Sequence, residues 1–158
     1  MKGADKVLIE KRLQELGINL PHPPAPAAQY VPAVLCGEFA FVAGQTPKEG
    51  TRLVYRGKVG KELTVEEGAD AARICALRCI SAIREATGDL DRVERIVQIT
   101  GYVNCGEDFD KHSLVINGAS DLLEKIFGQK GRHSRVAVGA NSLPGNAAVE
   151  IRMTAKIK

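Results

Sequence analysis

Strict alternation of apolar and polar residues near the C-terminus constrains the fold more than any other feature of this chain. From 149 to 157 every odd position is apolar and every even position carries a charge or a hydroxyl. A period of two predicts a half-buried strand, with one face in the core. Residues 134–140 alternate in the same way, and we expect Val136, Val138 and Ala140 to face the core. The C-terminal part of the chain is therefore expected to form a sheet.

The segment between these two strands predicts how they pair. Residues 141–146 are rich in types that favour turns, which indicates an antiparallel hairpin. Such a hairpin makes Arg135 and Glu150 diagonal neighbours, about 5 to 8 Å apart, on the face away from the core. Together with Ala137 and Gly139 they would form a niche for a small anion. The alternative, on geometry alone, is an exposed cross-strand salt bridge of little energetic value.

Upstream signals predict the rest of a two-layer α+β domain. Thr64 and Glu67 form a capping-box pattern at the start of a helix, and Gly88 follows its last turn. The expected elements before the C-terminal strands are a hairpin (31–36 and 39–43), a short edge strand (53–55), a helix (64–86), a strand (93–104) and a second helix (110–127). This order favours one mixed sheet with both long helices on one face.

The N-terminal segment differs in character from the remainder. Residues 4–16 have Val7, Leu8, Leu13 and Leu16 near helical spacing, with Gly17 as a stop signal. The prolines that follow predict an extended connector. We therefore divide the chain into an appended helix and connector (1–25) and a main domain (26–158).

Composition limits the classes of function. The 158 residues are 44% hydrophobic and 26% charged, with a net charge of +3 and only 4% aromatic residues. The weak charge and the scarcity of stacking side chains argue against nucleic acid as a partner. Without an apolar run of about 20 residues or a signal-peptide pattern, we expect a cytoplasmic protein that does not bind membranes. Four cysteines and three histidines, none at ligand spacing, predict no metal site, and we read Cys75 and Cys79 as small buried residues.

Three stretches resemble the RidA/YjgF family of reactive intermediate deaminases, also called L-PSP endoribonucleases. Arg135, Leu143-Pro144 and Glu150 are similar to the C-terminal signature of the family. Residues 39–47 resemble its hydrophobic strand ending in a Ser-Gly-Gln-x-Pro element, and Tyr30 precedes Gly44 by the spacing of a pocket tyrosine. The likeness spans residues 26–158.

The resemblance implies a chorismate-mutase-like fold and a homotrimer with ligand clefts between subunits. It further implies hydrolysis of enamines and imines, such as 2-aminoacrylate, to 2-keto acids and ammonia, as by 2-iminobutanoate/2-iminopropanoate deaminases. Arg135 would bind the substrate carboxylate and Glu150 would act as the base, without a cofactor. Gly44, Tyr30 and Asn117 would line the pocket, although Asn117 could equally be a solvent-facing helix residue.

The chain departs from the family pattern at several points. Ala43 replaces the usual serine, Ala137 stands where studied members have cysteine, and compact members lack the first 25 residues. These departures define a divergent branch. Two alternatives to the deaminase stay open: a non-catalytic trimer that binds small carboxylates, and an endoribonuclease. The composition argues against the second, and single histidines at 22, 112 and 133 are read as surface groups.

Overall fold

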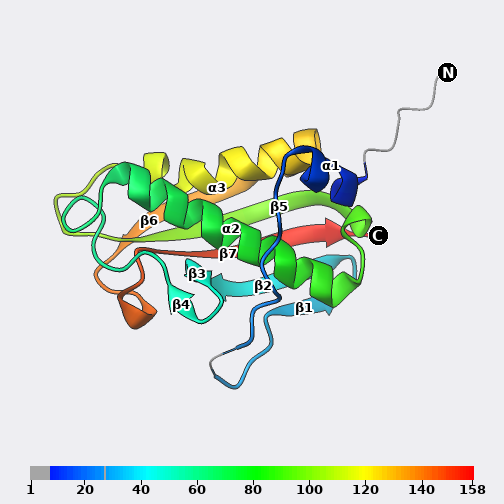
Figure 1. Cartoon of the computed structure of the whole chain (residues 1–158), viewed down its shortest axis with the longest axis horizontal. Helices are drawn as coiled ribbons and strands as arrows, with labels where there is room; N and C mark the ends of the chain where they lie inside the picture. The colour runs from blue at the N-terminus through cyan, green and yellow to red at the C-terminus, as the bar shows by residue number, and fades with distance from the viewer. Residues whose placement is uncertain (1–7, 27) are drawn as a thin grey trace.

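A mixed five-stranded sheet with two long helices on one face forms the body of the molecule (Figure 1). This computed structural model describes residues 8–26 and 28–158. In spatial order the strands are β1 (Ala33–Cys36), β2 (Phe39–Gln45), β7 (Val149–Ile157), β5 (Val93–Asn104) and β6 (Ser134–Ala140). The helices are α1 (Ile9–Glu15), α2 (Val65–Thr87) and α3 (His112–Phe127), with short 3-10 turns η1 (Leu90–Arg92), η2 (Gly128–Gly131) and η3 (Pro144–Asn146). The predicted α+β class, with a mixed sheet, is confirmed.

Both ends of α2 follow the predicted signals. The Thr64 hydroxyl accepts a hydrogen bond from the Glu67 amide, and the Glu67 carboxylate accepts one from the Thr64 amide. At the other end, Gly88 takes the left-handed conformation with φ of 74°. Between them lie Cys75 and Cys79, which are fully buried and donate to carbonyl oxygens of β7. Burial raises the pKa of both thiols, as expected for small core residues.

The predicted hairpin between the last two strands is wrong. β6 pairs in parallel with β5, and β7 pairs antiparallel with both β5 and β2. The chain after β6 therefore crosses the end of β5, where the Asn104 side chain donates to Asn146 and Ala147. The predicted edge strand at 53–55 is also replaced, by a separate hairpin of β3 (Lys48–Glu49) and β4 (Arg52–Leu53).

The faces of β6 are the reverse of those predicted. Val136 and Val138 are 46% and 38% exposed on the open face of the sheet. Ala137 packs on the core, and a methyl group at Gly139 would lie 2.8 Å from His112 Nε2. Ala137 and Gly139 face α3 because the helix approaches this strand closely. Since neighbouring side chains of a strand point to opposite faces, Val136 and Val138 then point to the open face.

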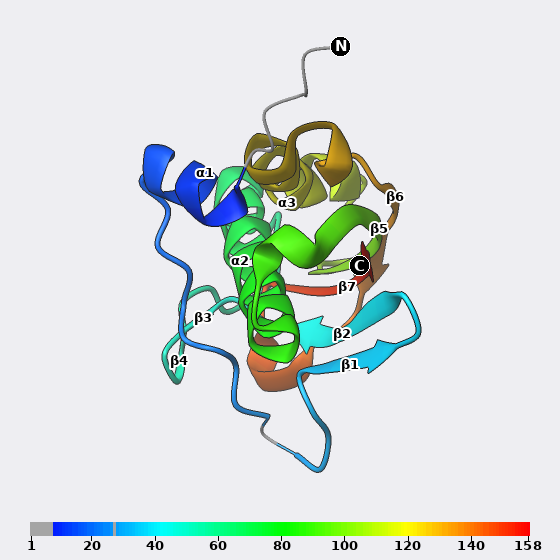
Figure 2. The same ribbon diagram turned by 90° about the vertical axis from the view of Figure 1, so that its right-hand side faces the viewer.

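Residues 8–26 of the N-terminal segment pack against the helices, on the side away from the sheet (Figure 2). Within them helix α1 spans Ile9–Glu15, and Gly17, just beyond its end, has φ of 65°. Ile9 and Leu13, one turn apart, enter the core, whereas Leu8 is 45% exposed. The predicted contribution of Val7 lies outside the described residues. A separate domain boundary after residue 25 stays a prediction.

Candidate functional site

Glu150 lies on β7 and points to the open face of the sheet. Its neighbours Val149 and Ile151 are buried in the core, so alternation places the carboxylate on the opposite side. Burial raises the pKa of Glu150 above its ordinary value. None of the ion pairs among residues 8–26 and 28–158 includes Glu150. The result is a partly buried carboxylate without an ion-pair partner in the described part of the chain.

Gly44 lies directly against this carboxylate. The pairing of β2 with β7 shifts register between Val42 and Gln45, so Gly44 sits in an irregular stretch beside Glu150. A Cβ atom at Gly44 would lie 2.9 Å from Glu150 Cδ, so a larger residue there would have to displace the Glu150 carboxylate. Gly44 and Tyr30 both line a small hollow of about 40 Å³. The structure thus brings three of the predicted site residues into one region of a single chain.

Arg135 lies elsewhere, at the sheet edge beneath α3. Its Nη1 donates to Ser120 Oγ at 3.0 Å, and its Nη2 donates to the Ser113 carbonyl at 3.1 Å. Asn117 falls between these serines at helical spacing, so all three share one face of α3. The sequence reasoning missed both serines, although the Ser-Asn-Ser spacing over 113–120 was a usable signal.

The predicted contact between Arg135 and Glu150 is therefore wrong for a single chain. Arg135 is in register with Ile99 on the helix-covered face, and Glu150 is in register with Tyr102 on the open face. The strand β5 lies between them, which separates their backbones by about 10 Å across the sheet alone. Arg152, two residues farther along β7, forms no ion pair with Glu150 within the described residues, and its Nε donates to Thr100 Oγ1 at 3.5 Å.

Two histidines predicted as surface groups have specific contacts. His133 Nε2 lies 3.0 Å from Ser120 Oγ, its Nδ1 lies 2.6 Å from the Gly131 carbonyl, and burial lowers its pKa. His112 Nε2 lies 3.5 Å from the Sγ of Cys105, a residue that is 6% exposed. A histidine therefore lies beside the Cys105 thiol. Burial raises the pKa of this thiol, which keeps it protonated and weakly nucleophilic.

Neither a metal site nor a membrane span emerges from the described residues. No three His, Cys, Asp or Glu side chains of that part of the chain are grouped as metal ligands would be. None of its helices combines the length and apolar character that crossing a bilayer requires.

The strand order, the two covering helices and a glutamate beside a glycine bulge define a chorismate-mutase-like α+β protein. The chain belongs to the YjgF family, since residues 10–157 match the family model described as "YjgF/chorismate_mutase-like, putative endoribonuclease". It is 47% identical over 144 residues to "Protein TCP17" of Trypanosoma cruzi, covering 90% of each chain. The resemblance inferred from sequence is thereby confirmed.

Two solved structures agree closely with this fold. Atu1372 of Agrobacterium tumefaciens, a protein "with unknown function", is 40% identical with a TM-score of 0.88 over 95% of this chain and 92% of its own. A protein of Shewanella oneidensis named "a putative endoribonuclease" is 33% identical with a TM-score of 0.92, over 96% of this chain and 100% of its own. The match to the family model begins at residue 10, so it includes most of α1.

Proposed function

We propose that this protein hydrolyses reactive enamines and imines, such as 2-aminoacrylate, to 2-keto acids and ammonia. The observation that carries the proposal is Glu150, a partly buried carboxylate with a raised pKa and no ion-pair partner among the described residues. A base is most effective when its pKa approaches the working pH, and burial shifts Glu150 in that direction. The family resemblance supplies the class of substrate.

The proposed reaction requires one proton carrier. The enamine first tautomerises to the imine, and water then adds to the imine carbon while Glu150 accepts a proton from it. That proton passes to the nitrogen, which gives the carbinolamine. Glu150 then accepts the proton of the carbinolamine hydroxyl and passes it to the same nitrogen, so that the C–N bond breaks, ammonia leaves and the C=O bond of the 2-keto acid forms. Because the imine is already electrophilic, positioning and this proton transfer account for the chemistry.

Arg135 is the proposed ligand of the substrate carboxylate. Two of its nitrogens are held by Ser113 and Ser120, which fixes the plane of the guanidinium. Since β5 separates Arg135 from Glu150 within one chain, we propose that the complete site forms between copies in a homotrimer. Arg135 and Asn117 of one copy would then meet Tyr30, Gly44 and Glu150 of the next.

Two variants test the proposal with an enzymatically generated 2-aminoacrylate substrate and pyruvate as the ligand. Glu150→Gln keeps the shape and removes the base, so turnover should fall about 100-fold or more while pyruvate binding survives. Arg135→Lys keeps the charge but loses the planar fork, so pyruvate binding should weaken by about tenfold or more. Circular dichroism confirms folding of both. Unchanged turnover in both variants would refute the deaminase assignment.

A second candidate is a non-catalytic trimer that binds small carboxylates. It is favoured by Ala43 and Ala137, which stand where the family has a serine and a cysteine, and Ala137 packs beneath α3 without a reactive group. Pyruvate binding that depends on Arg135, without any turnover by the unmodified protein, would select this function. The name of the Shewanella relative suggests an endoribonuclease instead. RNA cleavage that persists in Glu150→Gln, with steep salt dependence of binding, would select that one.

A further inference from the structure

A groove runs along α2 next to the hollow that Gly44 and Tyr30 line, and Arg78, Lys48, Pro24 and Ala25 line both. Its walls are the connector at residues 19–25 and the turn of the β3–β4 hairpin, and its volume is about 820 Å³. Ile74 and Leu77 of α2 form an apolar floor, and Leu20 and Pro23 add apolar surface from the connector. This volume and lining suit a metabolite-sized molecule.

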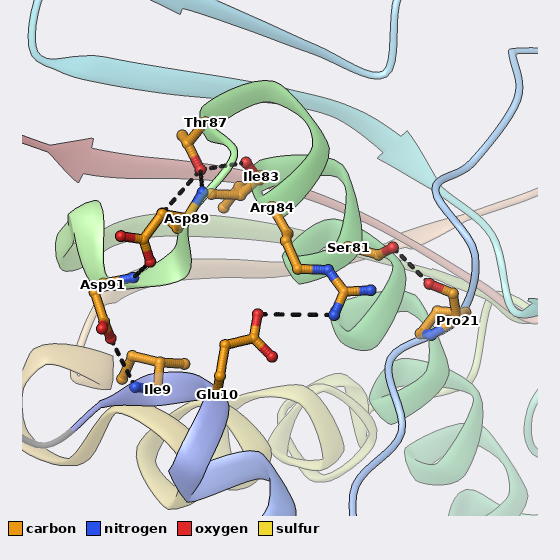
Figure 3. A network of polar contacts seen from close by, with 9 residues as sticks. All are labelled: Ile9, Glu10, Pro21, Ser81, Ile83, Arg84, Thr87, Asp89 and Asp91. Atoms are coloured by element: carbon orange, nitrogen blue, oxygen red, sulfur yellow. Dashed lines mark hydrogen bonds and ion pairs between the residues drawn. The ribbon is translucent and has the colours of Figure 1, made fainter.

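The connector that forms one wall is held in place by polar contacts with the main domain (Figure 3). Ser81 Oγ donates to the Pro21 carbonyl at 2.6 Å, next to the groove. In α1, which precedes the connector, the Ile9 amide donates to Asp91 Oδ1 at 2.7 Å, and Glu10 Oε1 lies 3.8 Å from Arg84 Nη1. The groove is therefore a formed feature of the folded chain.

Arg78 of α2 lies at the inner end of the groove and is 7% exposed. Its one hydrogen bond among the described residues is a 3.5 Å contact from Nη1 to the Lys48 carbonyl, and its Nε has no partner. Burial lowers the pKa of Arg78, because the buried guanidinium loses its contacts with water. No carboxylate of the described residues forms an ion pair that would offset this cost. A buried guanidinium in this condition is a strong receptor for an anion, since its planar fork can donate two parallel hydrogen bonds.

Two other ionic groups of the lining are engaged in ion pairs, whereas the half-buried Lys48 is in none of the ion pairs among the described residues. Arg73 Nε pairs with Asp70 at 2.7 Å, and Glu49 pairs with Arg52 at 3.6 Å. These pairs leave Arg78 as the buried cation of the lining that lacks an acidic partner in the described chain. We propose that the groove binds an organic anion, with its oxyanion head on the Arg78 Nη groups and its apolar body on Ile74 and Leu77. This proposal does not rest on the proposed deaminase activity.

Isothermal titration calorimetry with octanoate and its neutral isostere octanamide tests the proposal on the full chain. We expect octanoate to bind at least tenfold more tightly than octanamide. Arg78→Met should abolish that preference, because it retains apolar volume and removes the charge. Arg56→Met removes the same charge at an exposed position outside the groove lining, so it is the matched control and should keep the preference.

A groove-filling variant protects the test against misfolding of Arg78→Met. Thr51 is exposed on the hairpin wall, so Thr51→Trp should fill the groove without disturbing the core, and it should weaken octanoate binding at least tenfold. Equal affinity for octanoate and octanamide, or no binding of octanoate, would overturn the proposal. Loss of octanoate binding in Arg135→Lys, with retention in Thr51→Trp, would also overturn it, because the anion would then occupy the other cleft.

Discussion

At the scale of single residues, Glu150 makes the protein's stability depend on pH. Burial raises its pKa above the ordinary value of 4.5, so the folded state holds this proton more tightly than the unfolded chain. Its favourable contribution is complete below the ordinary pKa and is lost as pH rises through the raised value. Urea unfolding between about pH 4 and about pH 7 should therefore show the unmodified protein losing stability relative to Glu150→Gln.

Glu94 provides the opposite control for this measurement. Lys156 donates to it at 2.9 Å and lowers its pKa, so its contribution is present at higher pH and lost on acidification. The unmodified protein should gain stability relative to Glu94→Gln over the same rise in pH. If the unmodified protein instead gained stability relative to Glu150→Gln as the pH rises, as expected for Glu94, then a cation would reach the Glu150 carboxylate in solution.

A second prediction at this scale concerns the space around Gly44. Alanine there would displace the Glu150 carboxylate, which lies at the end of a flexible side chain, so Gly44→Ala should lower the free energy of unfolding by about 1 kcal/mol. Gly106 is the matched control, because a Cβ at that position meets no atom within 4 Å. Urea denaturation of both variants measures the difference. Equal stability of the two would mean that Glu150 moves aside at no cost.

At the scale of elements, α1 is predicted to add stability through one apolar stripe. Leu13 is 3% exposed, so Leu13→Ala should cost about 2 kcal/mol or more in chemical denaturation. Leu8, five residues earlier at the N-cap and 45% exposed, is the control, and Leu8→Ala should change stability by less than about 0.5 kcal/mol. Equal effects of the two would mean that α1 does not dock as described.

The elements themselves were largely predictable, whereas their pairing was not. Thr64, Glu67 and Gly88 act through local hydrogen bonds and dihedral angles, which the sequence specifies directly. The placement of β6 depends on its packing against α3 and its pairing with β5, which local sequence patterns do not specify. The apolar side chains of Val136 and Val138 therefore predicted that they face the core. In the structure they are exposed, and Gly139 lies beneath α3 because a larger residue would not fit there.

For the candidate site, too, the residues were easier to predict than their arrangement in space. Gly44 and Glu150 were identified by their sequence context, and β2 and β7 bring them together. The expected neighbour Arg135 is separated from them by β5, because a turn-rich linker does not exclude a crossover past an intervening strand. Arg78 escaped notice because a helical arginine usually points to solvent, and its burial depends on the connector packed over α2.

At the scale of the whole molecule, the open face of the sheet predicts self-association. Large apolar side chains lie there on strands at both edges of the sheet, and all are between 37% and 50% exposed in the single chain: Val34, Phe39, Phe41, Val136 and Val138. Exposed apolar surface of this kind typically marks a protein interface. Size-exclusion chromatography with light scattering should therefore report about three times the chain mass of 17.0 kDa.

Substitutions on that face distinguish a specific trimer from general association. Val136→Glu places a charge on the open face, so it should shift the protein toward monomer and abolish any site shared between copies. Leu8→Glu adds the same charge at a similarly exposed position on α1, away from the sheet, and should leave the assembly unchanged (Figure 2). Circular dichroism must show that both variants are folded. If the unmodified protein remained monomeric at micromolar concentration, Arg135 and Glu150 could not form one site, since β5 lies between them within each chain.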